Sequence, residues 1–428
     1  MLSFRRTPLI GACVLLVVVS AGESNAQTPE PSDASQQGAR VEWDPRPSIR
    51  IGNVARIDLR LKLQTEVRRV SSAQPLPGGT FDFFRRRVGI EGTLFDRVDF
   101  QIERELRSQG AWRDVFLNVR VAQPLEFRAG KFKIPFGLEQ TTGVTDLDFA
   151  YRTLGSQELT PAREIGAMAH GRAGGLVEYE AGVFRGDGEN ARATEPVFLF
   201  PDEAAPGRRP SMAARLVLTP FGRGGGSLPR FGAAMTSSTV NEGVNSLRGR
   251  SVFSSPFFPR VYTAGRRTRL GFETEWNPGP VGLRAEYIRA VEERNGQGLG
   301  NVDLSNVIGE SWYASATWIL TGESKDGNVE PRRPLFDGGF GAVEIGTRIE
   351  ELRFRSASRQ GPAFTNPRSD HLAGNNARVW TGGVNWYLNR WVRIQGNAIR
   401  ESFEDEARSP VFGQRTFWSG VLRTQLVI

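Results

Sequence analysis

The sequence has very few residues of the kinds that perform catalysis or bind metals. It holds one cysteine, Cys13, and two histidines, His170 and His371. Cys13 lies in an N-terminal apolar stretch, so the rest of the chain offers no disulfide and no thiolate ligand. Two histidines leave few groups that titrate near neutral pH, and no serine stands in a recognisable nucleophile motif. We therefore expect no enzyme, no metal site and no cofactor.

Long hydrophobic runs are also missing beyond the N-terminus, where none reaches the roughly 18 residues of a membrane helix. The N-terminus itself has the pattern of a secretory signal peptide over residues 1–26: Arg5 and Arg6, the apolar stretch Leu9–Val19, and Ser24-Asn25-Ala26 before Gln27. Residues 27–48 are rich in Pro, Gln, Ser and Ala, which predicts a flexible periplasmic segment. An exported chain without a membrane helix is either a soluble periplasmic protein or an outer-membrane β-barrel.

Lysine is scarce as well, yet the chain is basic. Its 55 Lys and Arg against 47 Asp and Glu give a net charge of +8. Nearly all the cations are arginine, which stays charged at any accessible pH and meets phosphate or carboxylate with a planar fork. The charges are spread along the chain and alternate with apolar residues, which favours a charged lumen over a nucleic-acid-binding patch. A GC-rich genome would explain the preference for arginine equally well.

What the sequence does have is alternation with a period of two, clearest between Arg56 and Arg68. Because successive side chains of a strand face opposite sides, this segment predicts one apolar face toward lipid and one charged face toward a lumen. The apolar face consists of Ile57, Leu59, Leu61, Leu63 and Val67, and the charged face of Arg56, Asp58, Arg60, Lys62, Gln64, Glu66 and Arg68.

The same pattern recurs along the chain, separated by connections that are short and long in turn. It is found at 98–106, 115–121, 177–183, 281–287, 343–349 and 392–398. Short turns at one end and long polar loops at the other are typical of a transmembrane barrel. We predict an all-β fold, an antiparallel barrel of about sixteen strands over residues 49–428. A soluble β-sandwich is the alternative, but it rarely needs so many charges on one strand face. The turn 320–341 is unexpectedly long for the short-turn end.

Aromatic residues support contact with outer-membrane lipid. Tryptophan and tyrosine prefer the two lipid–water interfaces of a membrane, where their amphipathic rings form girdles. Several of them fall at or near predicted strand ends: Trp276, Trp312, Trp318, Trp380, Trp386, Tyr387, Trp391 and Trp418.

Several segments resemble a known family. Residues 130–139, GKFKIPFGLE, are similar to the G-x-F-K-x-P-F-G-L-E signature of the phosphate-selective porin O and P family. The segments 84–95 (FRRRVGIEGTLF), 312–323 (WY…LTGE) and 383–388 (GVNWYL) resemble further motifs of the family in the same order. On these motifs the chain is identified as a member of that family.

The resemblance implies a sixteen-stranded, trimeric porin of the Gram-negative outer membrane, with residues 131–163 as an inward-folded constriction loop. Characterised relatives pass phosphate or polyphosphate along an arginine ladder. Two features depart from the pattern. The chain ends Gln425-Leu426-Val427-Ile428 without a terminal aromatic, and its loops lack a dense run of arginines, since Arg248, Arg250, Arg260, Arg266, Arg267 and Arg269 are scattered.

The candidate solute-binding residues are those expected on lumenal strand faces. Arg85 and Arg87 share one face, while Arg86 takes the lipid side. A ring of lumenal arginines replaces part of an anion's hydration shell and selects against cations; alternatively, these arginines only pair with lumenal acids. Asp114 is expected near Lys131 and Lys133; the resemblance implies that it helps to hold a solute or to orient the cations, and alternatively it only anchors the folded loop through a salt bridge. Arg56, Arg60 and Arg284 complete the candidates.

These observations leave three functions open. The first is an outer-membrane porin giving passive, anion-preferring diffusion of phosphate, polyphosphate or other small anions. The second is a structural or adhesive barrel with a plugged lumen and ligand-binding surface loops. The third is a specific transporter for another anionic nutrient. Because Glu178, Glu180, Glu286 and Glu344 are also expected to face inward, the predicted anion preference is modest.

Overall fold

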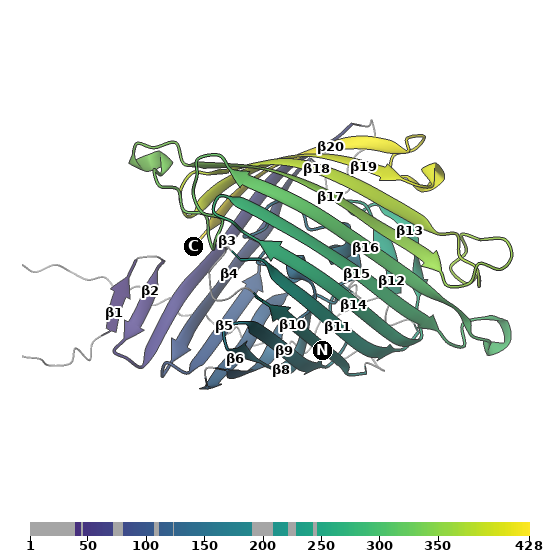
Figure 1. Ribbon diagram of the computed structural model, residues 1–428, viewed down its shortest axis with the longest axis horizontal. Coiled ribbons are helices and arrows are strands. Elements are labelled where there is room, and N and C mark those ends of the chain that lie inside the picture. The colour runs from purple at the N-terminus through teal and green to yellow at the C-terminus, as the bar shows by residue number, and fades with distance from the viewer. Residues whose placement is uncertain are drawn as a thin grey trace, which may run out of the picture. The chain divides into compact units, whose positions relative to one another are not determined.

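Strands follow one another along nearly the whole described chain (Figure 1). The computed structural model describes residues 39–43, 46–71, 80–106, 111–122, 124–190, 209–220, 228–242 and 246–428. The predicted signal peptide, residues 1–26, and residues 27–38 of the predicted flexible segment lie outside these ranges. Within them, no helix combines the length and the apolar character that crossing a membrane requires.

Sixteen of the described strands close into an antiparallel β-barrel, as predicted. Strand β20 pairs back with β3, from Ser419 opposite Val70 to Val427 opposite Lys62. The strands are β3 (Ala55–Val70), β4 (Phe81–Leu94), β5 (Val98–Glu105), β6 (Trp112–Ala122), β7 (Leu125–Lys133), β8 (Arg163–Ala173), β9 (Val177–Phe184), β10 (Ser211–Leu218), β11 (Arg230–Val240), β14 (Gly265–Trp276), β15 (Val281–Arg294), β16 (Leu304–Ile319), β17 (Ala342–Ser356), β18 (Asn375–Tyr387), β19 (Val392–Phe403) and β20 (Thr416–Val427).

The two faces of β3 follow the alternation of its sequence. Leu59 and Val67 are 50% and 51% exposed on the outer face, whereas Lys62, Gln64 and Glu66 are buried on the inner face. Outward apolar side chains meet lipid in a barrel of this kind, and inward polar side chains are covered because loops fill part of the lumen. The predicted assignment of faces in this strand is confirmed.

Strand β4 departs from simple alternation at one place. Gln64 lies opposite Arg85, but Glu66 lies opposite Asp82, so β4 carries one extra residue there. Such a β-bulge reverses the faces on either side of it. Phe83 therefore points outward, as Val88 does beyond the bulge, while Phe84 packs inward against the core of the lumen.

A two-stranded hairpin precedes the barrel, where we expected a segment without regular structure. Strand β1 (Ala39–Glu42) pairs with β2 (Ser48–Ile51), and β2 pairs with the first residues of β3. The period-two pattern of these strands is present but short. The Pro, Gln, Ser and Ala residues that precede it led us to predict a flexible segment instead. An ion pair of 2.7 Å between Arg50 Nε and Glu42 Oε2 joins the two strands.

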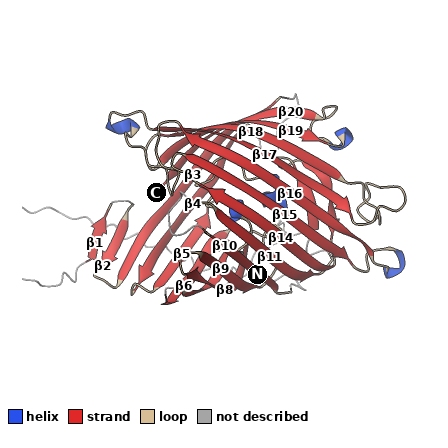
Figure 2. Cartoon of the chain, in the orientation of Figure 1, coloured by secondary structure: helices blue, strands red, loops and turns tan. Residues whose placement is uncertain are grey.

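Short turns lie at one end of the barrel and longer loops at the other (Figure 2). The loops carry 3-10 helices η1 (Leu299–Asn301) and η3 (Glu406–Arg408), and the long turn 320–341 carries η2 (Leu335–Asp337). Trp276, Trp318 and Trp418 are 39–52% exposed near strand ends, as expected of interfacial rings. Tyr387 differs: it is buried in the lumen, and its hydroxyl donates to Glu344 Oε2 at 2.8 Å.

Candidate functional site

The connection between β7 and β8, residues 134–162, turns into the barrel and is called the inner loop below. Side chains of the wall hold its backbone from several strands. Arg393 Nη2 donates to the Thr145 carbonyl at 2.7 Å, Ala150 N donates to Asn397 Oδ1 at 2.7 Å, and Leu154 N donates to Glu350 Oε2 at 2.6 Å. Because β17 and β19 lie across the barrel from β7 and β8 in the order of paired strands, the inner loop crosses the lumen.

The sequence 132–137 explains how the chain enters the inner loop. Phe132 and Ile134 pack into one apolar cluster of the lumen, and Phe136 packs into a second. The two clusters together anchor the start of the inner loop. Gly137 then adopts a φ of 83°, a conformation that favours glycine, and a Cβ atom there would lie 2.7 Å from Glu286 Oε1. The helices α1 (Leu138–Thr141) and α2 (Leu154–Glu158) follow, and Thr153 caps α2 by accepting from Ser156 N at 3.2 Å.

A second loop also packs inside the barrel, and it contains a hairpin of β12 (Ser246–Arg250) and β13 (Pro256–Tyr262). The ring of Phe258 stacks on that of Phe354 with 4.6 Å between centroids, and Phe257 packs between Phe354 and Phe403. Val252 N donates to Glu401 Oε2 at 3.0 Å. We did not predict this hairpin, which lies in the connection between β11 and β14. Its apolar residues join the inner loop in a core that fills the lumen beside β15–β20.

An open cavity of about 360 Å³ remains on the other side, between the inner loop and the wall formed by β3–β9. We call it the basic cavity because its charged lining is mostly cationic. The cationic residues are Arg60, Lys62, Arg87, Arg128, Lys133 and Arg163, and the acidic ones are Asp114 and Glu180.

The structure brings several predicted site residues together here and places others elsewhere. Arg60, Arg87, Asp114 and Lys133 line the basic cavity. Arg85 bonds instead to the side chain of Gln64, with its guanidinium 4.4 Å from the Phe84 ring centroid. The three remaining candidates each meet an acidic residue away from the cavity: Lys131 with Glu189 at 2.8 Å, Arg56 with Asp58 at 2.8 Å, and Arg284 with Glu275 at 2.8 Å. Asp114 was expected beside Lys131, but the two lie in different groups.

Sequence reasoning missed three cations of this region. Arg128 lies on β7, where alternation would have marked it, while Arg163 was named only as the end of the predicted loop. Arg152 lies within the inner loop, and no periodic pattern could place it. Its Nη2 donates to the Thr142 carbonyl at 2.8 Å.

Carboxylates within the lumen neutralise part of the cationic charge. Arg87 Nε bonds Glu105 Oε2 at 2.8 Å, and its Nη1 lies 3.3 Å from Glu103 Oε1. Arg163 holds Asp114 with two bonds of 3.1 and 2.7 Å. The alternative role expected for Arg87, pairing with lumenal acids, is what the geometry shows.

Within the described chain, Lys133 and Arg152 bond carbonyl oxygens and not carboxylates. Lys133 Nζ donates to the carbonyls of Thr141 and Thr142 at 3.1 and 2.7 Å, and Arg152 shares the Thr142 carbonyl. Among the described residues, neither has a carboxylate within ion-pair distance. Burial lowers the pKa of Arg152 to about 10, with Arg163 and Arg87 adding to the fall and Glu139 opposing it. Arg152 is therefore still a cation at neutral pH.

Three of the scattered arginines of the second half of the chain pair with carboxylates. Arg267 and Arg269 both bind Asp187, at 2.6 and 2.7 Å, and Arg250 Nε bonds Glu158 Oε1 at 2.7 Å. These arginines brace the loops with ion pairs, so their charges are largely used within the protein.

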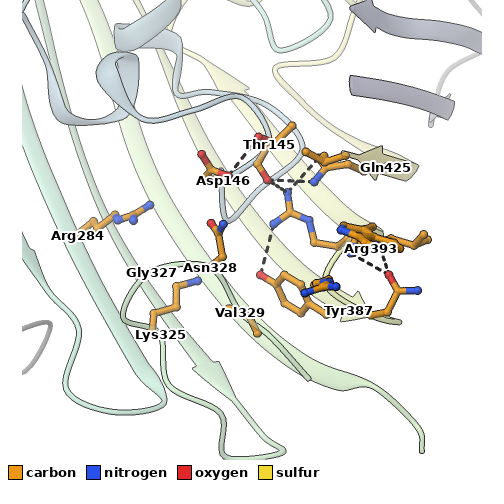
Figure 3. A pocket seen from close by; sticks show the side chains of 15 residues that line it. Thr145, Asp146, Arg284, Lys325, Gly327, Asn328, Val329, Tyr387, Arg393 and Gln425 are labelled. Atoms are coloured by element: carbon orange, nitrogen blue, oxygen red, sulfur yellow. Dashed lines mark hydrogen bonds between the residues drawn. The ribbon is translucent and has the colours of Figure 1, made fainter. Parts of the chain in front are cut away.

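A smaller cavity, of about 140 Å³, lies at the short-turn end (Figure 3). The inner loop contributes Thr145 and Asp146 to it, and the long turn 320–341 contributes Lys325 and Val329. Arg284 lines this cavity and bonds Asp148 Oδ2 at 3.2 Å. The long turn, unexplained by the sequence, thus reaches the inner loop.

Comparison with known proteins adds a family and a set of similar folds. The sequence model of the family described as phosphate-selective porin O and P matches residues 57–426. OmpT of Vibrio cholerae superposes with a TM-score of 0.55 at 11% identity, covering 88% of this chain and 98% of OmpT. Its trimer form gives 0.52 at 14%, with 88% and 100% covered. The outer membrane channel DcaP of Acinetobacter baumannii gives 0.53 at 8%, with 88% and 98% covered. No curated protein sequence matches significantly.

Proposed function

The chain belongs to the phosphate-selective porin O and P family, and we propose that it is a passive channel of the Gram-negative outer membrane that prefers small anions. Phosphate, polyphosphate and other small anions are the proposed solutes. The porin fold agrees with the family, and the preference for anions over cations is what we propose.

One observation carries the proposed anion preference: the open part of the lumen is lined mostly by cations. Six of the charged side chains around the basic cavity are Lys or Arg, and two are acidic. The opposite wall is more evenly balanced, because its Glu344 pairs with Lys325 and its Glu350 pairs with Arg348. An anion in the cavity therefore meets cationic groups that replace part of its hydration shell.

The preference should be modest, because neighbouring acids reduce the field of most of these cations. Lys133 is the strongest candidate for contact with a passing anion, since it lines the basic cavity and its described partners are carbonyl oxygens, one of which it shares with Arg152. A carbonyl carries only a partial charge, so it offsets less of a neighbouring cation's field than a carboxylate does.

Reversal potentials in a salt gradient test the proposal. The purified full-length protein in a planar bilayer should give an anion-selective potential in a KCl gradient. The double variant Lys133→Met, Arg152→Met should move the potential toward cation selectivity. Arg378→Met removes a cation paired with Glu351 on the outer face of β18 and should leave the potential unchanged. A cation-selective wild type, or equal shifts in both variants, would refute the assignment.

We also propose that the protein assembles as a homotrimer, as the trimer form of Vibrio cholerae OmpT does. Chemical cross-linking in outer membranes should then give a ladder ending at three chains. A ladder ending at one or two chains would exclude this assembly.

A second function, a structural barrel with a plugged lumen, draws support from the apolar core inside the wall. The inner loop and the β12–β13 hairpin fill one side of the lumen with side chains such as Phe257, Phe258 and Tyr151. If the basic cavity does not continue through the barrel, reconstituted protein will show no unitary conductance in any salt.

A further inference from the structure

The long turn 320–341 is a braced element that reaches both neighbouring turns. Lys325 N donates to the Gly279 carbonyl at 2.7 Å, in the β14–β15 turn, and Leu335 N donates to the Leu388 carbonyl at 2.8 Å, in the β18–β19 turn. The ring of Phe340 stacks on Trp386 with 5.2 Å between centroids. A turn held at several points has few alternative conformations, so it can support a neighbouring part of the molecule.

Part of this turn enters the barrel. Val329 is buried with Ile319, Ala342 and Tyr387 in a small apolar cluster at the rim. Lys325 is only 7% exposed and extends toward the inner loop (Figure 3). A lysine is rarely buried unless its ammonium has charged or hydrogen-bonding partners.

The partners of Lys325 come from two different elements. Its Nζ lies 2.6 Å from Asp148 Oδ1 of the inner loop and also bonds Glu344 of β17. Glu344 in turn accepts from Asn385 at 2.9 Å and from the Tyr387 hydroxyl at 2.8 Å. The ammonium thus bridges the inner loop and the wall.

Lys325 and Arg284 are both needed to balance the carboxylates of this group. Burial alone would raise the pKa of the Asp148 carboxyl, but Arg284 and Lys325 outweigh burial and hold that pKa well below its usual range. The bridge therefore stays ionised across physiological pH. Without Lys325, the one described residue still paired with Asp148 would be Arg284, which also pairs with Glu275. Glu344 would then be a buried carboxylate with no ion-pair partner among the described residues.

We propose that Lys325 is a positioning residue that fixes the inner loop from the periplasmic side and so helps to set the width of the pore. Most other bonds to this part of the loop run from wall side chains to loop backbone, as those of Arg393 and Asn385 do, and Arg284 of β15 is the wall residue that bonds the Asp148 side chain. Asp148 instead offers its side chain to the turn. The neighbouring cavity of about 140 Å³ gives the loop space to move when this bridge is broken. The inference rests on the proposed channel function.

Single-channel recording of the full-length protein tests this role. Lys325→Met keeps most of the side-chain length but removes the charge. We expect a several-fold rise in open-channel noise and a changed unitary conductance. Lys325→Arg should restore quiet openings, because a guanidinium can bridge two carboxylates. Arg332→Met removes a cation of the same turn whose bond goes to the Gly322 carbonyl, and it should behave as wild type.

A double variant separates positioning from a general loss of stability. Asp148→Asn alone should also raise the noise, and the two changes together should give less than the sum of their single effects, because both break the bond that Lys325 and Asp148 share. Fewer assembled channels would lower the number of insertions but not the noise of each channel. If Lys325→Met fails to assemble, Asp148→Asn carries the test, since it leaves the bond between Lys325 and Glu344 in place.

Two results would overturn the inference: wild-type noise and conductance in Lys325→Met and in Asp148→Asn, or fully additive effects of the two changes. Failure of the proposed function would look different, because the wild-type protein would then give no anion-selective current at all.

Discussion

The lumenal cations of the β3–β8 wall differ in their partners, and the kind of partner decides what removal of the cation does. Arg87 lies against Glu103 and Glu105, and all three are at most 5% exposed. Lys133 bonds carbonyl oxygens. Breaking a buried ion pair leaves an uncompensated charge, whereas a carbonyl that loses a donor keeps no net charge. We therefore propose that Arg87 acts mainly on stability and that Lys133 acts mainly on selectivity.

We predict that Arg87→Met destabilises the barrel more than Lys133→Met does, by up to about 3 kcal/mol. Lys62 still binds Glu103 at 2.6 Å, which limits the loss. Urea unfolding of the two variants in detergent measures the difference. Equal unfolding midpoints would mean that the carboxylates reorganise around the missing guanidinium.

Position on the inner or outer face gives a second contrast between neighbouring residues. Leu61 lies on the lipid face of β3, and Arg60 lies on the lumenal face, where it pairs with Glu91. A charge at the bilayer midplane of the lipid face costs about 2–4 kcal/mol. Leu61→Arg should reduce the yield of heat-modifiable, membrane-inserted barrel, while Arg60→Ala should not. Similar yields for both variants would contradict the assignment of faces.

At the scale of elements, the inner loop depends on contacts with partners far away in sequence. Thr145, Leu147, Asp148 and Ala150 all bond side chains of β18–β20, more than 200 residues along the chain. The segment from 141 to 149 contains most of these bonds. The remaining anchors, such as Leu154 with Glu350, lie nearer α2.

We predict that deleting Thr141 to Phe149 raises unitary conductance several-fold, because the lumen loses its crossing segment while the barrel ladders stay intact. Bilayer recordings of the deletion variant, with heat-modifiability as the check on assembly, measure this effect. Unchanged conductance in an assembled barrel would show that the narrowest point lies elsewhere, for example at the β12–β13 hairpin.

The sequence predicted elements better than it predicted their partners. Alternation identified the lumenal face of β3 because a strand reports its two faces every second residue. It could not show that Asp114 pairs with Arg163, 49 residues away, or that Lys325 meets Asp148, 177 residues away. Those pairs depend on how loops fold inside a closed wall. The bulge in β4 also escaped detection, since one extra residue leaves no mark in composition.

At the scale of the whole molecule, cations outnumber carboxylates among the side chains that line the basic cavity. Mobile ions screen such a field over about 8 Å at physiological salt and over about 30 Å at 0.01 M. The width of the cavity then decides how far the cations act.

We predict that anion preference falls as salt rises. Reversal potentials at a constant concentration ratio, measured at mean KCl concentrations of roughly 0.01 and 1 M, should show a strong preference at the lower and a weak one at the upper value. A preference independent of salt would instead indicate a site where anions contact the cations directly, without intervening solvent.

Closure of the barrel by β3 and β20 imposes an order on folding. The other neighbouring strands of the barrel follow one another along the chain, so their ladders can form early, whereas Gln64 and Gln425 meet across 361 residues. Long-range pairing must wait, because the entropy of loop closure rises with separation.

The hairpin β1–β2 already occupies the start of the edge of β3 that β20 completes. Strand β2 thus limits the part of the β3 edge with which β20 can pair. Ile49→Pro, which removes a donor from that hairpin, should slow the appearance of the heat-modifiable form during refolding; unchanged kinetics would deny the hairpin this role. By this account, the first strands laid down determine the register in which the last one docks.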